Sequence, residues 1–140
     1  MALLVSALFF GFGHITNPGA TAWSSLAISI EAGLLFGLLY HVTRSLWWCI
    51  GLHAGWNFVQ GAVFGIPVSG IKVDGLLDSR LQGPDWLDGG GFGAEASLLT
   101  VLTCSIISLL LLRHMLRDRS VVRPFWAREK QMDADAAALR

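Results

Sequence analysis

Four long apolar stretches with almost no charged side chains limit what this chain can fold into. They cover residues 1–12, 26–42, 46–64 and 98–112. A helix needs about 17 to 25 residues to cross a bilayer core, and the second and third stretches have this length. The composition, 54% hydrophobic and only 14% charged, is also unlike that of a soluble domain. We therefore expect an all-α, polytopic transmembrane helical bundle with about four apolar helices.

The charged residues predict how such a bundle is oriented. Arg44 follows the second stretch, the Gly-rich loop 65–96 is mainly acidic, and residues 113–140 are rich in Arg and Lys. Cytoplasmic segments of membrane proteins collect Arg and Lys. We expect a membrane-embedded domain over 1–112 with loop 65–96 outside, and a basic cytoplasmic tail over 113–140. The expected location is the plasma (inner) membrane, with lipid contacts and no nucleic-acid binding.

Polar side chains within the apolar stretches are the candidates for chemistry, because each is costly in a bilayer without a partner or a wet cavity. His53 and Asn57 are four residues apart, which places them on one face of a helix. Small neighbours, Gly51 and Gly55 among them, would let a second helix or a substrate approach closely. The two side chains can therefore act on one ligand, although interhelical hydrogen bonding is an equally simple role for them.

His14 offers a second imidazole at the end of the first stretch. It lies one helical turn after Phe10, and Gly11 and Gly13 permit close packing there. Imidazole can transfer protons, stabilise an oxyanion or bind a transition metal. Peptide hydrolysis additionally needs a group that activates water. Glu31 is a carboxylate in the second stretch, but its position near the end of that stretch predicts a structural or interfacial role rather than catalysis.

Two ordered motifs resemble a known family. Phe10-xxx-His14 followed by His53-xxx-Asn57 resembles the second and third motifs of the CAAX prenyl endopeptidase and bacteriocin-processing family, whose bacterial members are often described as abortive-infection proteins. The intervening segments 17–21 and 32–40 resemble it too. The resemblance is dense from about residue 5 to 70 and looser to about 112.

The resemblance implies an intramembrane peptidase that hydrolyses membrane-associated or prenylated peptides. In that scheme His14 acts with paired glutamates to activate water, and His53 and Asn57 stabilise the oxyanion. All three are therefore the expected catalytic residues. The resemblance also implies a divalent metal, zinc, with His14 and His53 as the candidate ligands.

One motif of the family is missing. Its paired glutamates, followed by a spaced Arg, do not occur in this chain, whose first Glu is Glu31. Because Met1 falls inside an apolar stretch, we expect a truncated chain that lacks the water-activating half of the site. The alternatives are a catalytically inactive membrane binding or immunity protein, and a membrane protein in which two histidines bind haem.

Overall fold

The computed structural model describes residues 1–117, and within them the chain is helical and contains no strand. The predicted tail beyond residue 117 lies outside the described residues. The elements are α1 (Ala2–Phe12), α2 (Ala22–Ile28), the π-helix η1 (Ser29–Leu34), α3 (Leu35–Thr43), α4 (Leu46–Asn57), the π-helix η2 (Phe58–Val63), α5 (Asp85–Asp88), the 3-10 helices η3 (Gly90–Phe92) and η4 (Ala94–Ala96), and α6 (Leu98–Arg117).

The longest helical segment is continuous from α2 through η1 to α3. It begins at a capping box, in which the Thr21 hydroxyl oxygen accepts from the Ser24 amide and the Ser24 hydroxyl oxygen accepts from the Thr21 amide. Such reciprocal bonds satisfy amides that the first turn leaves free. The cap starts the helix at Ala22, four residues before the apolar stretch. In η1 the backbone hydrogen bonds join residues five apart instead of four, which makes the helix wider. This π-helical distortion often occurs at functional sites.

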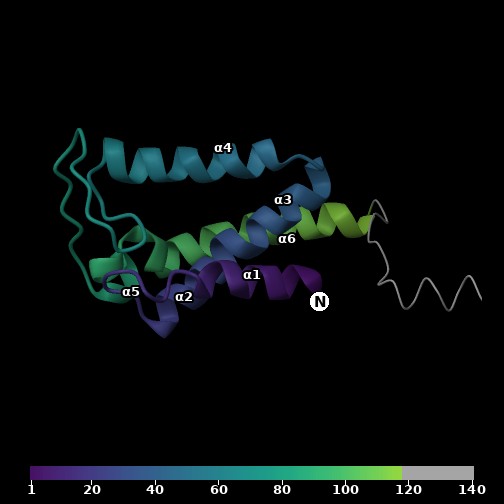
Figure 1. Ribbon diagram of the computed structural model, residues 1–140, viewed down its shortest axis with the longest axis horizontal. Coiled ribbons are helices and arrows are strands. Elements are labelled where there is room, and N and C mark those ends of the chain that lie inside the picture. The colour runs from purple at the N-terminus through teal and green to yellow at the C-terminus, as the bar shows by residue number, and fades with distance from the viewer. Residues whose placement is uncertain (118–140) are drawn as a thin grey trace, which may run out of the picture.

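A tight turn reverses the chain between α3 and α4. Arg44 ends α3 with a left-handed φ of 54°, and its guanidinium lies 5.9 Å from the centre of the Tyr40 ring. Figure 1 shows α4 running back alongside the bundle formed by α1, the long helical segment and α6. No residue of α4 is buried, so α4 stands apart from that bundle as one wall of the molecule.

The packing of α1 on the long helical segment is unusually close. A Cβ atom on Gly11 would overlap the Ser29 hydroxyl and the Ser25 carbonyl oxygen. A Cβ atom on Gly33 would lie 2.7 Å from the Cα of Ala7. Small residues are the usual means by which membrane helices approach backbone to backbone. This contact sets the position of the end of α1, where His14 lies.

The Gly-rich connection 65–97 closes one end of the bundle. The Asn17 side-chain amide donates to the Ser69 carbonyl oxygen at 2.9 Å, and the Gly70 amide donates to the Phe92 carbonyl oxygen at 2.7 Å. Gly70 has φ +83°, and a side chain there would meet the backbone of the chain turn after α1. These contacts hold the connection against that turn and so fix its position over the helix ends. They do not test the prediction that the connection lies outside the membrane.

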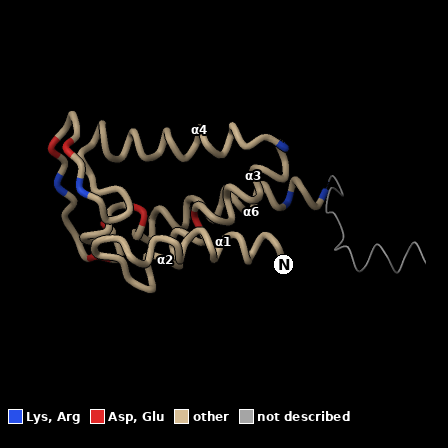
Figure 2. The backbone as a smooth tube through the Cα atoms, viewed as in Figure 1, with Lys and Arg blue, Asp and Glu red and all other residues tan. Residues whose placement is uncertain are grey.

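Two helical segments are long and apolar enough to cross a membrane, Ala22–Thr43 and Leu98–Arg117. Helices also form at the other two predicted stretches, but the predicted count of about four crossing helices is not confirmed. Figure 2 shows basic residues at the end of the bundle where α3 turns into α4 and α6 ends, and most acidic residues in the connection at the opposite end, which also contains Lys72 and Arg80. α6 extends through Arg117, so the first residues of the predicted tail are helical.

We predict that Gly11→Ala destabilises the chain, because the new methyl group must displace the backbone of η1. Overpacking of this kind costs about 1–3 kcal/mol. Gly51→Ala is the matched control, since no atom lies within 4 Å of a Cβ built there and alanine favours helix. Thermal unfolding of the full chain in detergent, followed by circular dichroism, should show a lower Tm for Gly11→Ala alone. Equal Tm values for both variants would contradict the packing described.

Candidate functional site

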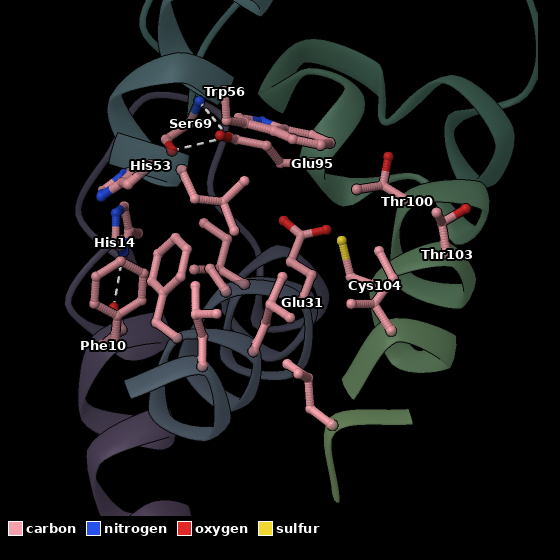
Figure 3. A pocket seen from close by; sticks show the side chains of 18 of the residues that line it. Phe10, His14, Glu31, His53, Trp56, Ser69, Glu95, Thr100, Thr103 and Cys104 are labelled. Atoms are coloured by element: carbon pink, nitrogen blue, oxygen red, sulfur yellow. Dashed lines mark hydrogen bonds between the residues drawn. The ribbon is translucent and has the colours of Figure 1, made fainter. Parts of the chain in front are cut away.

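A cavity of about 530 Å³ lies between α4 and the bundle. Its walls come from α1, the long helical segment, α4, α6 and the connection 65–97. Most of the lining is apolar, and the polar side chains gather at the end near the connection (Figure 3). Apolar pockets with a few convergent polar groups are typical of ligand sites. The polar or sulfur-bearing lining residues are His14, Glu31, His53, Trp56, Ser69, Glu95, Thr100, Thr103 and Cys104.

His14 lies just beyond the end of α1 and lines the cavity. Its Nδ1 is 2.8 Å from the Phe10 carbonyl oxygen. Because a carbonyl oxygen only accepts, Nδ1 must carry the proton in this bond. The neutral ring therefore has its lone pair on Nε2. His14 is thus arranged to accept a proton or bind an electrophile through Nε2.

His53 reaches the same end of the cavity from α4, although the two histidines are far apart in sequence. Phe10 packs against both imidazoles, with ring centroids 5.3 Å from His14 and 5.7 Å from His53. Phe36 contacts the other side of this group, 5.4 Å from His53. Figure 3 shows the two imidazoles next to each other. The motif spacing predicted this pairing, and the break in α1 after Phe12 makes it geometrically feasible.

Asn57 shares the helix face of His53, but it does not line the cavity. It is the last residue of α4, where the helix widens into η2. Its Oδ1 is buried and has no hydrogen-bond partner among residues 1–117. The structure therefore brings His14 and His53 together and leaves Asn57 beside them, and its expected role in oxyanion stabilisation stays a prediction.

Glu31, for which the sequence predicted a structural or interfacial role, lies inside the protein and not on its surface. It is only 5% exposed and lines the cavity from η1. The sequence interpretation measured depth along a regular α-helix from Leu26, whereas the helix begins at Ala22 and widens at Glu31. Both effects move this side chain inward and toward the cavity.

Glu95 is a site residue that the sequence interpretation missed. It is 6% exposed and comes from η4 in the Gly-rich connection, which the sequence predicted to be a mainly acidic loop outside the membrane. The Ser69 amide and the Ser69 hydroxyl, the latter at 2.8 Å, both donate to its Oε2. Burial raises the pKa of Glu95, and the bonds from Ser69 and the nearby charge of His14 oppose that rise. A single polar residue after a glycine run carries no periodic signal that would have revealed it.

The predicted metal site is incomplete in the described residues. Within 1–117, no three His, Cys, Asp or Glu side chains lie close enough to bind one metal ion. His14 Nδ1 is also engaged by Phe10. Catalytic zinc sites use three protein ligands, so the donor set here does not fit such an ion, and zinc binding by His14 and His53 stays a prediction.

Comparison with known proteins gives one match. Residues 1–59 match the family model of the type II CAAX prenyl endopeptidases, described as Rce1-like. No curated protein and no solved structure matches the chain. The matched segment contains His14, Glu31, His53 and Asn57 and excludes Glu95. The predicted resemblance is thus confirmed over these residues, and together with the two apolar segments it indicates a membrane protein.

We predict that neutral His14 carries its proton on Nδ1, because Phe10 offers only an acceptor. Histidine ¹⁵N chemical shifts of the full chain in detergent report which ring nitrogen is protonated. The His14→Gln variant identifies the signals of His14 by their disappearance. A neutral His14 ring protonated on Nε2 would contradict the hydrogen bond to Phe10.

Proposed function

We propose that this chain is an intramembrane peptidase that hydrolyses a peptide bond in prenylated, membrane-associated peptides. The observation that carries the proposal is the juxtaposition of His14 and His53 at the polar end of a large apolar cavity. The family match over residues 1–59 supports the reaction class, since that family is described as prenyl endopeptidases. Family likeness alone would support only the fold and not the chemistry.

The shape and polarity of the cavity support the substrate class. Leu35 and Leu39 of α3 and Ile107 and Leu111 of α6 form an apolar wall away from the histidines. A prenyl chain bound there gains about 0.8 kcal/mol for each CH₂ removed from water. The attached peptide would then extend toward the polar end. This division into apolar and polar parts suits a substrate that combines lipid and peptide.

The two histidines suit different steps of peptide hydrolysis. Attack on a peptide carbonyl develops negative charge on its oxygen, which a positioned N–H donor stabilises. Within residues 1–117 no hydrogen bond holds the ring nitrogens of His53, so its N–H is available for that oxygen. His14, protonated at Nδ1, offers Nε2 as a proton acceptor. Asn57, on the same helix face as His53, could add an amide donor after a small shift of α4.

We further propose that the chain lies in the plasma (inner) membrane with the Arg44 turn and the C-terminal tail in the cytoplasm. The excess of acidic over basic residues in the connection, and the basic residues without acidic ones, within residues 1–117, at the Arg44 end of the bundle, support this orientation (Figure 2).

We predict that the full chain in proteoliposomes cleaves a farnesylated peptide and that His53→Ala lowers kcat/KM by about 10²-fold or more, the usual loss when an oxyanion donor is removed. His41→Ala is the matched control, because His41 does not line the cavity. The same peptide without its prenyl group should react at least about tenfold more slowly at low concentration. Peptide release is measured by mass spectrometry.

Two results would overturn the proposal. Unchanged cleavage by His53→Ala would show that this site takes no part in the reaction. Saturable binding of the prenylated peptide without any cleavage would instead establish the alternative, a catalytically inactive binding protein.

A further inference from the structure

A groove lies on the side of α4 that faces away from His53 and the cavity. It has a volume of about 440 Å³, runs along α4 and η2 from Gly51 to Gln60, and is bounded by Ile66 and Ala94 of the connection. Gly51 and His53 are two residues apart, which places them on opposite sides of a helix with 3.6 residues per turn. We call this space the outer groove. The helix that presents His53 to the cavity thus presents its other side to the outer groove.

Gly51 and Gly55 of the outer groove are not explained by the packing of this chain. No atom of residues 1–117 lies within 4 Å of a Cβ built on either residue, whereas a Cβ on Gly11 or Gly33 would overlap a neighbouring backbone. Glycine is, after proline, the least favourable residue within a helix. Two glycines four residues apart lie on one helix face and allow another helix to approach backbone to backbone. The pair therefore indicates a contact with a helix outside the single chain.

Gln60 supplies an independent sign of such a contact. It lines the outer groove and is 6% exposed. Its Nε2 donates to the Pro67 carbonyl oxygen at 2.6 Å, but its Oε1 is buried and has no partner among residues 1–117. An unpaired buried acceptor is destabilising, and the apolar chains of lipids cannot donate a hydrogen bond to it. A protein segment that brings a donor into the groove therefore suits this site better than lipid does.

We propose that a second copy of this chain packs its α4 into the outer groove, so that two copies form a parallel, two-fold symmetric dimer. This inference does not depend on the proposed peptidase function. All copies insert with one orientation, because the distribution of basic residues sets it. A two-fold axis along the membrane normal then places the same surface of both copies face to face. Gly51 and Gly55 meet the same glycines of the second copy, and Gln60 lies at the level of its own counterpart.

Self-complementarity favours a second copy over a helix of another protein. Each Gln60 amide has an unpaired acceptor, Oε1, and a second N–H on Nε2 beyond the one that bonds Pro67. Two such amides related by a two-fold axis satisfy each other after a rotation about the last side-chain bond. Trp48, Leu52 and Val59, which lie around the glycines, are 65%, 43% and 47% exposed and can fill the groove of the second copy. One surface thus provides both the groove and the side chains that fill it.

The dimer also supports one wall of the cavity. No residue of α4 is buried in the single chain, and Leu52 and Trp56 line both the cavity and the outer groove. A second α4 supplies the packing that this helix lacks in the single chain. The contact therefore holds the helix that carries His53.

Gly55→Leu tests the dimer, because the larger side chain prevents close approach of a second helix but enters open space in the single chain. Full chains that carry a donor or an acceptor fluorescent protein after Arg140 are mixed in phosphatidylcholine vesicles, and energy transfer is followed as lipid dilutes the protein. We expect the wild type to dimerise and Gly55→Leu to have an apparent Kd at least about tenfold higher. Ala54→Leu is the matched control, since Ala54 is exposed on the same helix and lines neither space. It should dimerise as the wild type does.

Disulfide formation tests the parallel arrangement. In a full chain with Cys49→Ala and Cys104→Ala, the thiol introduced by Gly55→Cys lies close to its counterpart, so that oxidation should link two copies. Leu109→Cys is the control, because Leu109 is 63% exposed on α6 and lies outside the groove. It should stay unlinked.

Three results would overturn the inference. The first is energy transfer in the wild type no greater than that of randomly distributed monomers, which would leave the groove to lipid or to the helix of another protein. The second is equal association of Gly55→Leu and the wild type, and the third is equal cross-linking at positions 55 and 109. Neither measurement uses peptide cleavage, so failure of the dimer would leave the proposed function standing.

Discussion

The close contact between α1 and the widened helix η1 is the constraint on which the rest of the structure depends. Gly11 and Gly33 remove the side chains that would separate the two backbones. In a bilayer, where lipid is as apolar as leucine, such packing is a main source of helix association. The contact holds the end of α1 beside the residues of η1, so His14 and Glu31 face one cavity. Loss of the contact would separate both polar groups from that cavity together.

The cavity combines two environments that rarely meet in one site. Its walls are apolar enough to hold a lipid chain, yet one end contains two imidazoles and two carboxyl groups. Low polarity strengthens the electrostatic interactions among these groups. Two of these groups have a specific hydrogen-bond partner, since His14 is bonded to Phe10 and Glu95 to Ser69. The exposed helix α4 closes this space on one side, so a modest movement of α4 would change access to it.

Sequence patterns predicted the long helices and the two histidines of the site. The long apolar stretches located the helices, and the four-residue spacings of Phe10 with His14 and of His53 with Asn57 identified the histidines that meet. Glu95 could not be found in this way, because its position depends on hydrogen bonds from Ser69, a residue much earlier in the same Gly-rich connection. Glu31 was recognised as a candidate, but regular helical spacing cannot describe a residue in a π-helix. Regular helical spacing also fails to describe the position of Asn57, because the π-helix η2 begins directly after it.

The central claim is that His14 and His53, which come from separate parts of the chain, act on one transition state. A double-mutant cycle on kcat/KM for the prenylated peptide tests it most directly, using His14→Gln, His53→Ala and the double variant of the full chain. Residues that act as a unit give strongly non-additive losses. The account predicts that the double variant is about as slow as the slower single variant. A double variant whose loss equals the product of the two single losses would contradict it.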